Sequence, residues 1–349
     1  MSADGRLREL GLRIGELEAG PLDSIADVAG VSVGHVTIRR DEPEPPDGHG
    51  VARTGVTAVL PAPPERLLVQ EPVSAGAAVL NGAGELTSFI QVGEWGRIET
   101  PVYLTSTMAV GRVYDGAVAA AVASDPTVGV ENFVIPTVGE CDDGWLNDAR
   151  TVQVADSDVA RALDAASEEV AEGAVGAGAG MICFGWKGGI GTASRLVGNA
   201  VVGVLVLTNF GSSRQLRIDG LPVGRLIEPP PRGRGGDGGS CIGVVATDAD
   251  LGTHALSRLA RRVGLGLART GSVAHHGSGE IFLAFSTGGG EQVADGDLNP
   301  FFAAVVEASE EAVLNSLWAA EDTDGRAGRV VKALPHEPVL ALLREHGRV

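Results

Sequence analysis

The sequence is poor in cysteine and in long apolar runs. Its 349 residues include only three cysteines, an odd number without paired spacing, which argues against a disulfide framework and a C-x-x-C zinc site. No apolar stretch reaches membrane-spanning length without a glycine or a charge inside it. The charged N-terminal segment also lacks the apolar core of a secretory signal. We therefore expect a soluble, cytoplasmic protein with no membrane partner.

Positive charge is also scarce. Lys and Arg together number 27 against 45 Asp and Glu, which gives a formal net charge of −18. Because so acidic a surface repels phosphate backbones, we expect no nucleic-acid partner. Hydrophobic residues make up 44% of the chain and charged residues 21%, which supports a packed core. We predict a single large domain over residues 1–349.

Familiar cofactor and metal motifs are missing. The sequence has no G-x-x-x-x-G-K-[ST] phosphate loop and no H-E-x-x-H zinc motif. The one histidine cluster is the pair His275-His276, and adjacent residues on a strand point to opposite faces, which disfavours joint metal ligation. We predict neither a metal nor an organic cofactor.

Glycine, by contrast, is abundant, with 51 residues, many of them inside apolar runs where they permit close backbone approach. Residues 41–50 and 228–239 have the composition of exposed loops, and the second should also be mobile. Elsewhere, hydrophobic periodicity predicts strands at 28–38, 55–62, 100–107, 199–208, from 240 onward and at 279–287, and helices at 108–124, 156–172, 253–270, 299–320 and 337–346. Because strands and helices do not alternate strictly, we predict a layered α+β fold.

The most informative feature is the junction between the glycine-rich loop and Ser240. A glycine before a serine allows the strained backbone geometry in which the serine Oγ attacks the preceding carbonyl. Hydrolysis of the resulting ester leaves Ser240 with a free α-amine, whose ordinary pKa of about 7.7–8.0 suits a general base. A loop that merely precedes a strand is the alternative interpretation of the same residues.

Motifs along nearly the whole chain resemble those of a known family. They run in order from GPLDSIADVAGVSVGHVTI through LNGAGELT, VGECDDGWLND, CFGWKGGIGTASR and LVLTNFG to GGSCIGVVATDADL and GSGEIFLAFST. In these motifs the chain is similar to the P1 family of self-processing peptidases, which includes DmpA-type L-aminopeptidase/D-Ala-esterases and β-aminopeptidases. The resemblance implies an αββα four-layer sandwich related to N-terminal nucleophile hydrolases. It also implies an aminopeptidase that acts on short peptides, amino-acid amides or esters.

The same resemblance implies a catalytic apparatus. Gly239–Ser240 matches the self-cleavage bond, which would divide the chain into 1–239 and 240–349, and Ser240 matches the nucleophile. Asn209 matches the amide that stabilises the oxyanion, and Ser278 and Glu280 match a pair that orients the nucleophile's amine. Residues two apart on an extended segment share a face, so this pair can act together. We expect both pieces to stay together, because the strand that begins at Ser240 should be internal to the sheet. Because relatives form homo-oligomers, we expect the same here, for example a tetramer of heterodimers.

Further positions concern charge near the substrate. Lys187 matches a lysine near the cleavage site that would stabilise negative charge. Glu140 matches an acid that holds the substrate ammonium. Where relatives often place an aromatic residue after this acid, the chain has Asp142 and Asp143. This departure predicts a more acidic pocket and leaves the preferred side chain open.

Two other functions remain open on the sequence. Ornithine acetyltransferases share the fold and the self-processing but use a threonine nucleophile, so Ser240 argues against an acyltransferase. An unprocessed, non-catalytic homologue is the third interpretation. If Ser240 is not the nucleophile, the adjacent Cys241 is the first substitute, although the cysteines resemble ordinary small core residues.

Overall fold

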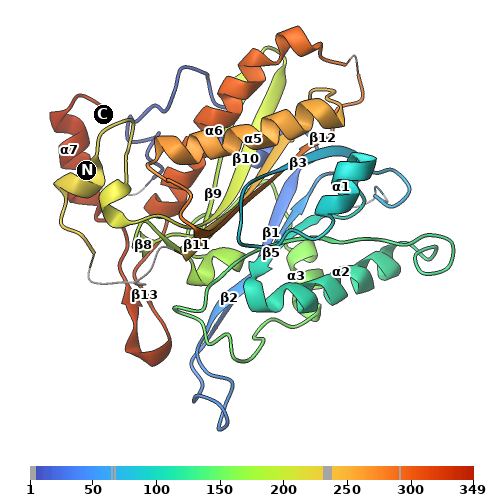
Figure 1. Cartoon of the computed structure of the whole chain (residues 1–349), viewed down its shortest axis with the longest axis horizontal. Coiled ribbons are helices and arrows are strands. Elements are labelled where there is room, and N and C mark those ends of the chain that lie inside the picture. Colours follow the sequence, from blue (N-terminus) through green and yellow to red (C-terminus); the bar gives the residue numbers. More distant parts are fainter. Residues whose placement is uncertain (1–4, 64–65, 67, 231–237, 291) are drawn as a thin grey trace.

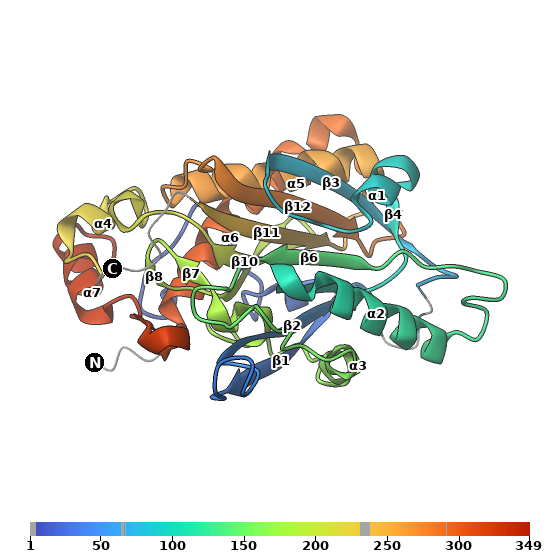
Figure 2. The same ribbon diagram turned by 60° about the horizontal axis from the view of Figure 1, so that its bottom comes forward.

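The computed structural model describes the chain except for residues 1–4, 64–65, 67, 231–237 and 291. Most of the predicted loop 228–239 thus falls outside the described residues. In the described part, two large sheets lie face to face, and helices cover both outer faces (Figures 1 and 2). The expected four-layer αββα sandwich is confirmed.

The larger sheet has, within the described residues, the strand order β4-β3-β12-β11-β10-β9. Its strands are β3 (Val73–Gly82), β4 (Arg97–Ile98), β9 (Ile190–Val197), β10 (Ala200–Asn209), β11 (Gly238–Thr247) and β12 (Gly277–Ser286). The strand that carries Ser240, β11, is internal, antiparallel to β10 and parallel to β12.

The smaller sheet has the order β1-β2-β5-β6. Its strands are β1 (Ser32–Arg40), β2 (Ala52–Leu60), β5 (Val102–Ser106) and β6 (Thr137–Cys141). Two short strand pairs complete the described strands: β7 (Ile182–Cys183) with β8 (Trp186–Lys187), and β13 (Thr323–Asp324) with β14 (Val330–Val331).

Each sheet has its own pair of covering helices (Figure 2). Helices α5 (Thr253–Arg269) and α6 (Asn299–Trp318) pack on the larger sheet, and α2 (Val110–Ser124) and α3 (Ser157–Asp164) pack on the smaller one. The remaining helices are α1 (Phe89–Trp95), α4 (Val223–Leu226) and α7 (His336–Glu345). None of the helices in the described ranges is long and apolar enough to cross a membrane.

Strand alternation decides which side chains face the interior between the sheets. In β11, Ile242 and Val244 belong to the core between the two sheets, whereas Cys241 and Val245 belong to the core under α5 and α6. Because successive side chains of a strand point to opposite faces, Ser240 faces the interior between the sheets.

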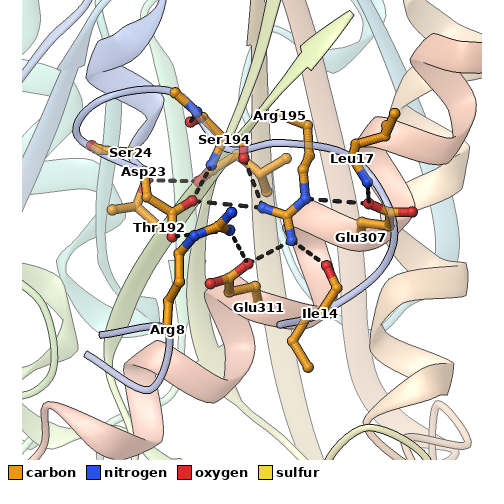
Figure 3. Close-up of polar contacts among 12 residues, drawn as sticks. Arg8, Ile14, Leu17, Asp23, Ser24, Thr192, Ser194, Arg195, Glu307 and Glu311 are labelled. Carbon is orange, nitrogen blue, oxygen red and sulfur yellow. Dashed lines mark hydrogen bonds and ion pairs between the residues drawn. The ribbon is translucent and has the colours of Figure 1, made fainter. Parts of the chain in front are cut away.

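A buried ion-pair cluster fastens the N-terminal segment onto the larger sheet (Figure 3). Arg195 on β9 is fully buried and donates to the carboxylates of Glu311 at 2.5 Å and Glu307 at 3.3 Å, both on α6. It also donates to the carbonyl of Ile14 at 2.7 Å, and Asp23 lies 3.6 Å from its guanidinium. One buried cation therefore joins β9, α6 and the chain that precedes β1.

Two predicted boundaries are wrong. The helix predicted over 156–172 ends at Asp164, because Ser167 leaves the helix to pair with Val33 of β1 through backbone hydrogen bonds of 2.9 and 3.1 Å. The second predicted loop is shorter than expected, since Gly238 and Gly239 already belong to β11. Strands β3, β6 and β9 were not predicted from the sequence.

Candidate active site

Ser240 lies at one end of the central strands of the larger sheet. Strand pairing sets it opposite Asn209, the last residue of β10, and opposite Gly279 of β12. Its side chain is buried, and its hydroxyl lies within hydrogen-bonding reach of the Cys141 thiol on β6. A Cβ at Gly239 would lie only 2.7 Å from the backbone oxygen of Asn209, so glycine permits this close strand approach.

The side chain of Asn209 is held by two hydrogen bonds. Its Oδ1 accepts from the backbone N–H of Ile182 at 3.0 Å, and its Nδ2 donates to the carbonyl of Asp142 at 2.9 Å. An amide nitrogen carries two hydrogens, so one remains for a further acceptor. Two hydrogen bonds therefore fix the side-chain amide of Asn209, and its Nδ2 keeps one N–H free to donate on the strand next to Ser240.

Ser278 and Glu280 form a buried pair on β12. The Ser278 hydroxyl donates to Oε1 of Glu280, and both side chains are almost fully buried. Burial raises the pKa of Glu280, and its Oε2 has no hydrogen-bond partner among the described residues. Both residues flank Gly279, the partner of Ser240, but they face the opposite side of the sheet from the Ser240 side chain. They thus adjoin the backbone of Ser240 rather than its hydroxyl.

Lys187 is fully buried, which lowers the pKa of its ammonium group to about 7. Its Nζ donates to the carbonyl oxygens of Gly178 and Met181 at 2.9 Å and of Gly188 at 2.7 Å. These bonds use all three hydrogens of the ammonium group. Because the residue after Met181 holds Oδ1 of Asn209, Lys187 braces the loop that orients this amide.

Glu140 lies near the end of β6 and is also buried. Its Oε1 accepts from the backbone N–H of Glu85 at 2.9 Å, and its Oε2 accepts from the Thr107 hydroxyl. Burial raises the pKa of this carboxyl. A Cβ at Gly84 would lie 3.1 Å from Oε1 of Glu140 and 3.5 Å from the Cα of Gly279. Glu140 is therefore close to the strand partner of Ser240.

The two aspartates after Glu140 take different positions. Asp142 is half-buried, and its side chain accepts from the backbone N–H of Gly144 at 2.9 Å. Asp143 is buried and accepts from the Asn147 amide at 3.0 Å, and burial raises its pKa to about 7. Asp142 thus contributes its carbonyl to Asn209, while Asp143 belongs to the protein interior.

The structure also shows where the residues behind the alternative interpretations lie. Cys241 is buried under α5 and α6, and burial raises the pKa of its thiol well above the usual range, which disfavours a thiolate nucleophile. The pair His275-His276 precedes β12, and His275 contacts Gln215 through their Nε2 atoms at 3.1 Å. In the ranges that the structure describes, no group of three or more His, Cys, Asp or Glu side chains could hold a metal ion.

Sequence reasoning missed the residues that position the expected side chains. Glu85 lies within LNGAGELT, a motif that carried the resemblance, but its backbone role toward Glu140 has no sequence signal. Thr107 and Cys141 are separated in sequence from the groups they contact and were not singled out. Only the folded chain brings them to the site.

Comparison with known proteins identifies the family. The family model described as Peptidase family S58 matches residues 23–331. The Beta-peptidyl aminopeptidase BapA of Sphingosinicella microcystinivorans is 40% identical over 381 aligned residues, which cover 100% of this chain and 94% of that protein.

Solved structures share the fold over nearly the full length. The PH0078 protein from Pyrococcus horikoshii OT3 has a TM-score of 0.92 and 42% identity, with 99% of this chain and 100% of that chain covered. The L-aminopeptidase D-Ala-esterase/amidase from Ochrobactrum anthropi, described as a variant of the Ntn hydrolase fold, has a TM-score of 0.88 and 38% identity, with 98% and 99% covered. The resemblance seen in the sequence motifs is confirmed, and the chain belongs to peptidase family S58.

Proposed function

We propose that the chain cleaves itself between Gly239 and Ser240 and that the new N-terminal Ser240 then serves as the nucleophile of an aminopeptidase. Aminopeptidase activity is supported by the family match and by the relatives described above. The observation that carries the assignment of residues is the strand register, which sets Ser240 between the anchored amide of Asn209 and the Ser278–Glu280 pair.

Self-cleavage would proceed by an N-to-O acyl shift. The Oγ of Ser240 attacks the carbonyl carbon of Gly239, the peptide C–N bond breaks, and the Ser240 nitrogen becomes a free amine. Water then hydrolyses the ester, which returns the hydroxyl to Ser240 and leaves a carboxylate on Gly239. Oε2 of Glu280, on the strand next to Ser240, has no hydrogen-bond partner among the described residues, and the α-ammonium group of a processed Ser240 would supply one.

In the proposed turnover, the α-amine takes the proton of the Ser240 hydroxyl as Oγ attacks the substrate carbonyl. The second Nδ2 hydrogen of Asn209 stabilises the oxyanion, and the protonated amine then returns its proton to the leaving amine. Water hydrolyses the acyl-enzyme. Glu140 and Asp142 would bind the ammonium end of a short peptide, amino-acid amide or ester. Lys187 would act through the loop that it braces and through its charge.

The cellular compartment and the assembly of the enzyme are also proposals. We assign the enzyme to the cytoplasm, because three cysteines without a disulfide suit a reducing compartment. We further propose that the 1–239 and 240–349 chains remain together in a homo-oligomer, because β11 is internal to the larger sheet and cannot leave without disrupting it.

Denaturing mass spectrometry combined with an activity assay tests the proposal. Active protein should contain two chains, 1–239 and 240–349, and a Ser240→Ala variant should remain one folded, inactive chain. Ser240→Cys is expected to process, because a thiolate is a better nucleophile than a hydroxyl. An intact single chain in active enzyme contradicts self-cleavage, and hydrolysis by the Ala variant moves the nucleophile elsewhere, with Cys241 as the first residue to test.

A further inference from the structure

An apolar groove of about 550 Å³ includes Glu85, the residue whose backbone N–H donates to Glu140. It is formed by α1, by the segment that leads into α1 and by the residues before β6. Its apolar lining consists of Leu86, Phe89, Ile90, Trp95, Phe133 and Ile135. Ile90 is 87% exposed and Phe133 60% exposed. Large apolar side chains gathered at the surface are typical of a binding site.

The groove and the Glu140 carboxylate share one chain segment. Glu85 lines the groove, and its backbone N–H donates to Oε1 of Glu140 at 2.9 Å. The next residue, Leu86, forms a bridge with Gly139, which immediately precedes Glu140. The exposed residue Gly84 lies against Gly279, the strand partner of Ser240. The segment that lines the groove therefore also contacts the candidate active site.

We propose that this groove binds the apolar side chain of the substrate's N-terminal residue while Glu140 binds its ammonium group. This inference rests on the proposed function. The amino group and the side chain of an amino acid are attached to the same carbon or to nearby carbons, so a carboxylate held by a residue that lines an apolar groove suits both groups. Glu85 and Glu94 at the groove disfavour an acidic side chain by charge repulsion. The preferred substrates are thus peptides with a free amine and a large apolar first residue.

Values of kcat/KM for amino-acid anilides that differ only in the first residue test this inference. Discrimination by an apolar pocket reaches about 10-fold or more per methylene group, so leucine and phenylalanine anilides should exceed alanine anilide at least about tenfold. The double variant Ile90→Ser/Phe133→Ser should reduce that ratio to below about threefold, mainly by slowing hydrolysis of the leucine and phenylalanine anilides. Leu265→Ser on α5 is the matched control, because Leu265 is 57% exposed and lies outside the groove.

The outcomes separate the two proposals. Equal rates for leucine and alanine anilides overturn the groove assignment and leave the aminopeptidase intact. If no anilide is hydrolysed, the aminopeptidase proposal fails, and calorimetric binding of leucinol against alaninol then tests the groove directly. Tighter leucinol binding that the double variant abolishes supports the groove, and equal binding overturns it. A double variant that changes oligomeric mass but keeps the leucine preference also overturns it, because the groove is then a contact between copies.

Discussion

Two buried polar clusters of this molecule differ in how their acids are paired. Around Arg195, the carboxylates of Glu307 and Glu311 both contact a fully buried guanidinium. Around Ser240, Glu140 and Glu280 accept hydrogen bonds from hydroxyl or backbone N–H groups. The acids of the first cluster have a cation within the fold, whereas Oε2 of Glu280 has no hydrogen-bond partner among the described residues.

The difference separates a structural cluster from a site prepared for a ligand. Burying a carboxylate is unfavourable, and burial raises the pKa of Glu140 and Glu280 as well as that of Glu311, which it raises to about 7. The two clusters therefore differ in whether the fold supplies a cation to the acid, and not in the direction of the pKa change. In the proposed mechanism both acids gain a cation after folding. Glu280 faces the α-ammonium group of Ser240, and Glu140 faces the ammonium group of the substrate. Changes in the first cluster should therefore affect stability, and changes in the second should affect activity.

The largest effect on stability is expected for Arg195→Met. Removing the guanidinium leaves Glu307 buried without its cation and leaves Glu311 with Arg8 alone, 3.5 Å away, which should lower the free energy of unfolding by about 3–5 kcal/mol. Urea unfolding measures the change. Arg13→Met is the matched control from the same N-terminal segment, because the Arg13–Glu18 pair is exposed and should contribute little. Equal stability of the two variants would show that Arg195 does not stabilise the fold as argued.

Asn209→Ala should lower kcat by roughly 10²–10³-fold and change KM less, because it removes one oxyanion donor. Steady-state kinetics measures kcat and KM separately, and unfolding curves show whether the variant is as stable as the wild type.

Lys187→Met should also lower kcat, since it leaves three buried carbonyls without their donor. If Lys187 acts through Asn209, the double variant should lose little more than Asn209→Ala alone. If the double variant loses the full sum of the two single losses in kcat, Lys187 does not act through Asn209.

Glu140→Gln should reveal the ammonium site. An N-acetylated substrate leaves a buried carboxylate without its cation, so free-amine substrates should be hydrolysed at least roughly tenfold better than their acetylated counterparts. Glu140→Gln should narrow this ratio, mainly by slowing the free-amine substrate, as kcat/KM values on both substrates would show. Glu168→Gln is the matched control, because Glu168 is an exposed carboxylate outside the proposed site. Equal wild-type rates on both substrates would contradict the aminopeptidase assignment.

Asp143→Asn should produce the smallest change, visible in the pH dependence of stability. The pKa of Asp143 is about 7 in the folded state, above its ordinary value of 3.8, so the folded state binds more protons between about pH 4 and 7. Stability contributed by this group is therefore lost as pH rises through that window. The asparagine should flatten this decline and raise stability at pH 8 by at least about 1.4 kcal/mol, the equivalent of one pKa unit. If the pH dependence of stability is the same in both proteins, ionisation of Asp143 does not cause the decline.

The sequence by itself determined the elements with strong periodicity and the placement of Ser240 near the start of a buried strand. The β-branched run before Asn209 and the amphipathic pattern of α5 were sufficient because burial repeats every two or every 3.6 residues. The two-residue spacing of Ser278 and Glu280 likewise predicted a shared face, and the structure joins them by a hydrogen bond. The boundaries of α3 and β11 were wrong because pairing with distant strands decided them.

Only the tertiary structure decided the surroundings of the charged side chains. As an isolated residue Lys187 is most simply a surface ammonium group, and Glu280 a solvated charge, yet both are fully buried. The backbone N–H that Glu140 accepts from is 55 residues away in the chain, and the carbonyl that Asn209 donates to is 67 residues away. Such contacts leave no local pattern, because burial and partners depend on segments that meet only when the two sheets pack together.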